Sequence, residues 1–140
     1  MRNRRIKGII TAVLITLLLG IYIVDTYKKQ KHEKEYKEYM RKIESIKVED
    51  VDLTKVKDGE YLGETKAEDS SAKVKVIVKN HEIKNIEILE LIDKQGKQAK
   101  QITQRVLENQ SLDVDTITGA TYSSKVILKA TEEALKKGQK

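Results

Sequence analysis

The sequence predicts an α+β protein: a small antiparallel sheet with two helices packed on one face, preceded by one N-terminal transmembrane helix and a short stalk. Three patterns support this prediction. They are an apolar run near the N-terminus, an alternation of valine and lysine, and two stretches of helical periodicity in the last third of the chain. We therefore expect an anchor over residues 1–25, a charged juxtamembrane stalk over residues 26–56 and one globular domain over residues 57–140.

An uncharged, strongly apolar run covers residues 8–24, which is slightly shorter than the roughly 20 residues that cross a bilayer as a helix. It is followed by Asp25-Thr26-Tyr27, which lacks the small residues of a signal-peptidase site. The chain also has no cysteine to carry the acyl chains of a lipoprotein. These features favour a retained signal-anchor, in contact with membrane lipid through residues 8–24, over a cleaved signal peptide.

Basic residues stand on both sides of the apolar run, so the positive-inside count alone does not orient it. The head before the run is very short, and the downstream lysines are interleaved with acidic residues. We therefore expect the N-terminus in the cytoplasm. The protein is then a single-pass protein of the cell membrane with an extracytoplasmic C-terminal domain.

The net charge of +6 is unevenly distributed along the chain. Residues 1–56 carry 13 Lys or Arg against 8 Asp or Glu, whereas residues 57–140 carry 15 against 14. The basic excess thus belongs to the anchor and stalk, where anionic lipid is the natural partner. Because the globular part is nearly neutral, we expect no nucleic-acid binding.

The stalk contains one apolar stripe at helical spacing, formed by Tyr36, Tyr39, Met40, Ile43 and Ile46. This spacing predicts a juxtamembrane helix. Its stripe either folds back on the protein's own domain, the commoner case, or pairs with a partner.

The domain is expected to begin near Lys57, with a glycine-flanked turn and a first strand at residues 58–64. Alternating valines and lysines predict a second strand, and the apolar residues after Asn80-His81-Glu82 predict its return. Residues 72–92 should therefore form an antiparallel hairpin. His81 stands alone at the turn, so we predict no metal site.

Two helices should follow the hairpin. The first begins after Gly96, has Ala99, Ile102, Val106 and Leu107 on one face, and ends near residues 109–111. The second runs from about Ser123 or Ser124 to Lys137, with Gly138 just beyond its end.

A short motif, Asp115-x-x-Thr118-Gly119-Ala120-Thr121, lies immediately before the second helix. Glycine permits a tight turn there, and Thr121 offers a hydroxyl beside the unpaired N–H groups of a helix N-terminus, which favour a phosphate. The hydroxyls of Ser123 and Ser124 would add further donors. The simpler interpretation is that Thr118, Thr121 or Ser123 only caps the helix.

Residues 57–137 resemble the FMN-binding domain family, which is found in the periplasmic flavin subunits of sodium-pumping NADH:quinone reductase and Rnf-type complexes. The likeness rests on the hairpin, the following helix and two sequence patterns, Asp58-Gly59-x-Tyr61-x-Gly63 and Thr118-Gly119-Ala120-Thr121-x-Ser123. This domain is much shorter than those respiratory subunits. We therefore expect a minimal carrier rather than part of a large sodium pump.

The resemblance implies that a separate FAD-dependent flavin transferase joins FMN through its phosphate to the last threonine of the motif, Thr121. It also implies a recognition sequence, consisting of Asp115, Thr118, Gly119 and Ala120. For the isoalloxazine ring the domain offers few aromatic residues, and we expect Tyr122 or Tyr61 to stack on it.

The expected function is electron relay by covalently bound FMN, with redox partner proteins or quinone as donor and acceptor. Glu108, Asp113 and Asp115 are scattered and form no paired acid and base, so we assign no catalytic residue. The main alternative is a membrane-tethered, non-catalytic interaction or accessory module without flavin. A weaker one is an enzyme such as a flavin-dependent reductase.

Overall fold

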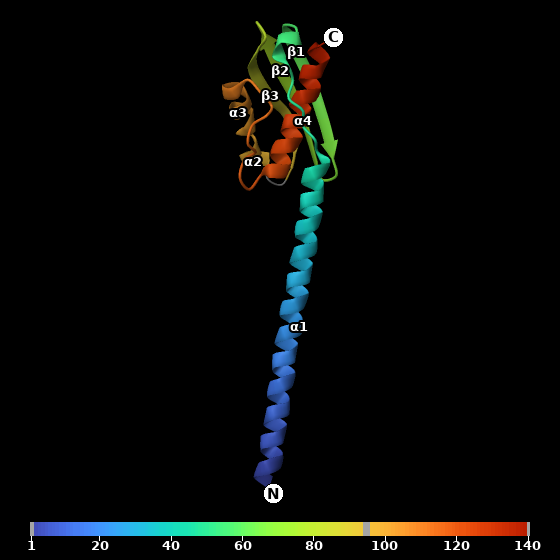
Figure 1. Ribbon diagram of the computed structural model, residues 1–140, viewed down its shortest axis with the longest axis vertical. Coiled ribbons are helices and arrows are strands. Elements are labelled where there is room, and N and C mark those ends of the chain that lie inside the picture. The colour runs from blue at the N-terminus through green and yellow to red at the C-terminus, as the bar shows by residue number, and fades with distance from the viewer. Residues whose placement is uncertain (1, 94–95, 140) are drawn as a thin grey trace. The chain divides into compact units, whose positions relative to one another are not determined.

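The computed structural model describes residues 2–93 and 96–139. It divides into two compact units, Met1–Arg41 and Lys42–Lys140. The described residues of the first unit all belong to helix α1 (Arg2–Ser45), whereas the second unit holds the sheet and the other helices (Figure 1).

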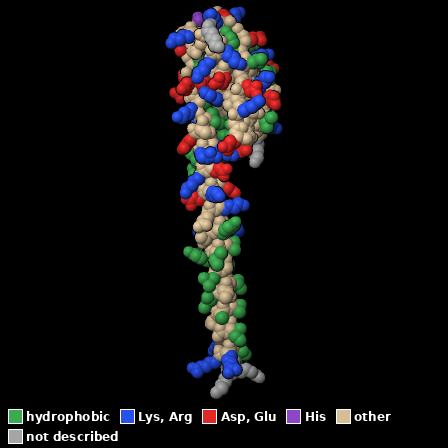
Figure 2. Space-filling model, turned by 90° about the vertical axis from the view of Figure 1, so that its right-hand side faces the viewer, with side chains coloured by type: hydrophobic (Ala, Val, Ile, Leu, Met, Phe, Trp, Pro, Cys, Tyr) green, Lys and Arg blue, Asp and Glu red, His purple; other side chains and the backbone are tan. Residues whose placement is uncertain are grey.

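The first unit confirms a long apolar helix at the N-terminus. By length and composition α1 is able to cross a membrane, and its large hydrophobic side chains between Ile6 and Val24 are exposed. Figure 2 shows these side chains along the helix, with Lys and Arg on either side of the apolar stretch. Exposure of so many aliphatic residues is costly in water and favourable in lipid.

The second unit contains a three-stranded antiparallel sheet of β1 (Gly59–Ala67), β2 (Ser70–Lys79) and β3 (Glu82–Ile92), in that order (Figure 1). The predicted hairpin is thus confirmed. Asn80 and His81 connect β2 to β3 with φ of 55° and 60°. Positive φ at both residues is typical of the two-residue turn whose twist matches that of the paired strands.

Helix α4 (Thr121–Gly138) packs against β1 and β2. The inward valines of β2, Val74, Val76 and Val78, are almost completely buried beneath it. Gly63 permits the close approach, since a Cβ there would lie 1.8 Å from the carbonyl oxygen of Ala130. The α+β class and its helix-covered sheet are therefore as the sequence predicts.

The single helix expected after Gly96 is instead two short helices, α2 (Gly96–Ala99) and α3 (Ile102–Asn109). Around Gln101 the backbone bonds reach back three residues rather than four, as from Gln104 N to Gln101 O. Such bonds tighten the chain locally. Ala99 and Ile102 both remain fully buried, so the apolar spacing alone did not reveal the break.

Helix α3 ends at Gln110, whose φ of 52° is left-handed. Its side-chain amide accepts a hydrogen bond from Ile83 N (2.7 Å) and donates one to Ile83 O (3.0 Å). The glutamine thus pairs with the N–H and C=O groups of Ile83 on the edge strand β3. Unpaired groups on such an edge can form a sheet with other chains.

Residues 46–56, which we call the strap, follow α1 and include the short 3₁₀ helix η1 (Leu53–Lys55). The compact second unit already begins at Lys42, well before residue 57, where sequence patterns place the start of the domain. Of the predicted apolar stripe, Ile43 and Ile46 are buried in this unit, whereas Tyr36 is exposed. The C-terminal part of the stripe therefore packs on its own domain.

Candidate functional site

The predicted motif lies in the loop between α3 and α4 and ends in a tight turn. The N–H of Ala120 donates to the carbonyl oxygen of Ile117 (2.9 Å), and Gly119 has a φ of 78°. A positive φ at this position favours glycine. A Cβ on Gly119 would meet only the Gln98 side-chain oxygen, at 3.9 Å, so the surface above the turn is open.

Helix α4 begins at Thr121, not at Ser123 or Ser124 as expected. Its first helical bond runs from Ser124 N to Ala120 O (2.9 Å). The reason is that the glycine turn allows Ala120, a residue rarely favoured at this position, to serve as the N-cap. Thr121 is consequently the first residue of the helix rather than part of the preceding loop.

No side chain caps this helix end. Ala120 cannot do so, and within residues 2–93 and 96–139 the N–H groups of Thr121, Tyr122 and Ser123 have no hydrogen-bond acceptor. These groups point out of the positive end of the helix dipole. The simple cap interpretation for Thr118, Thr121 or Ser123 is thus not observed.

The hydroxyls near the helix start differ in what they contact. The buried Ser123 donates to a carboxylate oxygen of Asp93, and Ser124 accepts from Ile117 N (3.2 Å). Thr121 is half-buried, and its hydroxyl makes no hydrogen bond to any described residue. Among these three, Thr121 is the one whose oxygen remains free for chemistry.

The remaining motif residues differ in exposure, and Ala120 is completely buried. Asp115, Thr118 and Gly119 are exposed. The carbonyl oxygen of Asp115 accepts a hydrogen bond from Arg105 on α3, at 2.7 Å from Nη1. Arg105 is absent from the sequence-based set, because nothing in the spacing of a single arginine on a short helix indicates a contact with a loop.

The two aromatic candidates lie in different places. Tyr122 is only 8% exposed and belongs to the core beneath α4. Tyr61 is half-buried on β1, where its hydroxyl donates to Lys57 O (2.8 Å). A Cβ on Gly138 would lie 2.7 Å from Tyr61 Cζ, so Tyr61 lies at the opposite end of α4 from Thr121.

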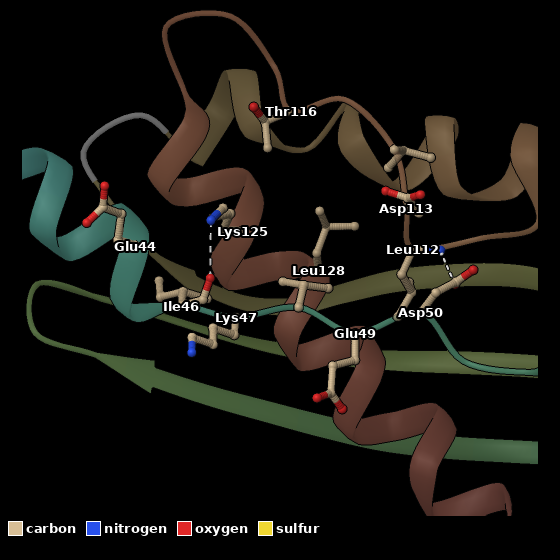
Figure 3. Close-up of a pocket in the computed structure, with 12 residues that line it drawn as sticks. Glu44, Ile46, Lys47, Glu49, Asp50, Leu112, Asp113, Thr116, Lys125 and Leu128 are labelled. Atoms are coloured by element: carbon tan, nitrogen blue, oxygen red, sulfur yellow. Dashed lines mark hydrogen bonds between the residues drawn. The ribbon is translucent and has the colours of Figure 1, made fainter.

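A groove of about 630 Å³ runs beside the first turns of α4, between the strap and the loop that carries the motif (Figure 3). Lys125 lines it, but its ammonium donates to the carbonyl oxygens of Ile43 (3.0 Å) and Ile46 (3.2 Å). Asp50 bridges the two walls, accepting hydrogen bonds from Leu112 N and Ser111 Oγ, both at 2.8 Å. The charges around this groove thus tie the strap to the domain.

The open end of α4 fits a phosphate ester. A hydroxyl and three N–H groups without a partner among the described residues lie at one helix start, next to a turn without side-chain bulk. Phosphate oxygens bind well to such a helix end.

Comparison with known protein families identifies the ligand. A family model described as FMN-binding domain matches residues 28–136, most of the chain. No curated protein matches. The chain therefore belongs to the FMN-binding domain family, and its cofactor is FMN.

Proposed function

We propose that the protein is a membrane-anchored, extracytoplasmic flavoprotein that carries FMN covalently on Thr121, through the phosphate, and relays electrons. The observation that carries this proposal is the open start of α4, where the Thr121 hydroxyl has no partner among the described residues. The family assignment supports the cofactor, and the apolar helix α1 supports the anchor.

The residues of the motif have different roles in this proposal. Thr121 supplies the oxygen that forms the ester, and the N–H groups of Thr121, Tyr122 and Ser123 bind the phosphate oxygens. Gly119 keeps the approach free of side-chain atoms. Asp115, exposed on the loop, serves with Thr118, Gly119 and Ala120 as the sequence that the flavin transferase recognises.

Attachment requires an enzyme, because no base among the described residues contacts the Thr121 hydroxyl. In the proposed step the Thr121 oxygen bonds to the phosphorus of the FMN half of FAD. The hydroxyl proton passes to a base on the transferase, and AMP leaves with the electrons of the broken P–O bond.

The bound flavin supplies reversible electron transfer, which the side chains of this protein lack. A covalent ester keeps the cofactor on the protein outside the cell, where a dissociated flavin would be lost by diffusion. The anchor holds the domain next to membrane-bound donors and acceptors, such as redox proteins or quinone.

Intact mass measured under denaturing conditions tests the proposal. The full chain is coexpressed with an active flavin transferase, beside the variants Thr121→Ala and Thr116→Ala. We expect the wild type and Thr116→Ala, which loses a hydroxyl at an unspecified position of the motif, to gain the mass of one phosphoester-linked FMN. Thr121→Ala should gain nothing. An unmodified wild type would refute the covalent carrier.

A further inference from the structure

We propose that Arg105 is a positioning residue for the attachment of FMN: it fixes the backbone of Asp115 and leaves the carboxylate of that residue free for the transferase. This proposal rests on the function proposed above. It concerns a residue outside the motif, on a different helix.

The contact is specific. Arg105 Nη1 donates to the carbonyl oxygen of Asp115 at 2.7 Å and to that of Thr116 at 3.2 Å. Residues 113–117 have no regular secondary structure, so their carbonyl groups receive no partner from a helix or sheet. One guanidinium thus satisfies two successive peptide groups of the recognition loop.

The loop has an anchor on each side of this contact. Before it, Leu112 N donates to Asp50 (2.8 Å), and after it Ile117 N donates to Ser124 (3.2 Å). Between these anchors Asp113 N donates to Ser111 Oγ (3.0 Å), and within residues 2–93 and 96–139 Arg105 is the side chain that bonds the backbone of Asp115 and Thr116. Its loss would release the part of the loop that carries Asp115.

The Asp115 side chain remains available. It is exposed, and it makes no hydrogen bond or ion pair with a described residue. Arg105 directs its donors to carbonyl oxygens rather than to this neighbouring carboxylate. A surface hollow of about 640 Å³, lined by both residues, gives a partner access to the carboxylate.

This arrangement affects how well the transferase binds its protein substrate. The enzyme must hold Asp115 while the Thr121 oxygen attacks the phosphorus of FAD and AMP departs. A loop that samples many conformations presents both groups correctly in only a fraction of molecules, and the apparent affinity falls by that fraction. Arginine suits the task because the N–H bonds of Nη1, which donates to both carbonyl oxygens, are fixed in the guanidinium plane, whereas the lysine ammonium is a freely rotating point charge.

Initial rates of FMN incorporation, followed by intact mass at increasing concentrations of full-length protein, test the proposal. Arg105→Gln removes the clamp, Arg105→Lys retains the charge, and Lys100→Gln removes a nearby exposed charge as a control. We expect Arg105→Gln to raise the KM for the protein substrate about tenfold, with a smaller change in kcat. Arg105→Lys should lie between it and the wild type, and Lys100→Gln should match the wild type.

An unchanged KM in Arg105→Gln would overturn the proposal, as would an equal rise in Lys100→Gln, which would indicate a general charge effect. If Arg105→Gln fails to fold, Arg105→Lys is measured by NMR relaxation. We expect lower order parameters at the Asp115 and Thr116 amides, and unchanged ones would overturn the proposal. A wild type that accepts no FMN would instead refute the proposed function. The relaxation measurement would then still test whether Arg105 orders the backbone of the loop.

Discussion

The two ends of helix α4 are built in opposite ways. At the C-terminal end, Gly138 O accepts a hydrogen bond from Lys57 N (3.0 Å), and Gln139 N donates to Lys136 O (3.3 Å). At the N-terminal end, three N–H groups and the Thr121 hydroxyl have no partner among the described residues. A helix end left open lacks the stabilisation that a cap provides, and here the open end is the one where we propose that FMN is attached.

The two ends of α4 are also expected to differ in role, one contributing to stability and the other to the attachment of FMN. The middle and C-terminal turns of α4 pack on β1 and contact the strap, whereas the motif ends at Thr121, the first residue of the helix. Changes in the later turns should therefore lower the free energy of unfolding without changing where FMN is attached. A change at Thr121, the half-buried first residue of the helix, should do the reverse.

The largest effect is expected from Gly63→Ala. The new Cβ would lie 1.8 Å from Ala130 O and 2.7 Å from Ala134 N, both rigid backbone atoms, so α4 must move away from β1. We expect the free energy of unfolding to fall by about 3 kcal/mol. Urea denaturation of the full chain in detergent measures this free energy.

Leu62→Ala, at an exposed neighbouring position, is the control and should lower the free energy of unfolding by less than about 1 kcal/mol. Equal losses in the two variants would contradict the close packing.

Glu132→Gln should have the next largest effect. This fully buried carboxylate accepts hydrogen bonds from Glu49 N (3.0 Å), Lys129 Nζ (2.8 Å) and Lys136 Nζ. Burial alone would raise the pKa of Glu132, but these hydrogen bonds outweigh it and hold the pKa below the ordinary value of 4.5. We expect a loss of about 2 kcal/mol at neutral pH.

The pH dependence of this loss is a sharper test. Because the folded-state pKa of Glu132 is below the unfolded one, its stabilisation is complete above pH 4.5 and disappears as the pH falls through the folded-state value. The difference between wild type and Glu132→Gln should therefore shrink on acidification. Glu133→Gln, which removes a more exposed neighbouring carboxylate, is the control and should change stability little. A difference that stays constant with pH would contradict the role of the Glu132 charge.

A smaller loss is expected from Gly138→Ala. Alanine gains up to about 1 kcal/mol in helix propensity, but its Cβ would lie 2.7 Å from both Tyr61 Cζ and Val56 Cγ1. We expect a net loss of about 1 kcal/mol in urea denaturation. A gain in stability would mean that the C-terminal end is less tightly closed than described.

The smallest change in stability, and the one that separates the two ends most clearly, is expected from Ala120→Ser. A serine at the N-cap offers an oxygen to the open N–H groups and should stabilise the protein by about 0.5 kcal/mol. It would also compete with the phosphate for those groups. We therefore expect slower FMN incorporation together with a higher midpoint of thermal unfolding, and an increased midpoint with an unchanged rate would contradict the phosphate-binding role.

Local patterns predicted the sheet and the place of the motif. Val74, Val76 and Val78 alternate with Lys73, Lys75 and Lys79 except at Ile77, and Asn80-His81 supplies a two-residue turn that sets the register. The start of α4 was predicted two or three residues too late, because serine is a common cap and alanine is not. The glycine turn outweighed that preference.

The strap and Arg105 could not be predicted in the same way. Ile46, Val51 and Val56 follow neither helical nor strand spacing, and the strap is held by bonds to distant residues such as Glu132 and Leu112. Arg105 likewise acts through carbonyl groups, which every residue has and which leave no trace in the sequence. Both depend on the tertiary fold.

Mapping of the flavin by tandem mass spectrometry of a proteolytic digest is the most direct test of the central claim. The full chain is isolated with its flavin and denatured before digestion. We predict that the FMN mass stays on the peptide containing residues 115–125 and that fragmentation assigns it to Thr121. Flavin released on denaturation, or an ester assigned to Thr118, Ser123 or Ser124, would contradict the assignment of the open hydroxyl at the start of α4 as the attachment point.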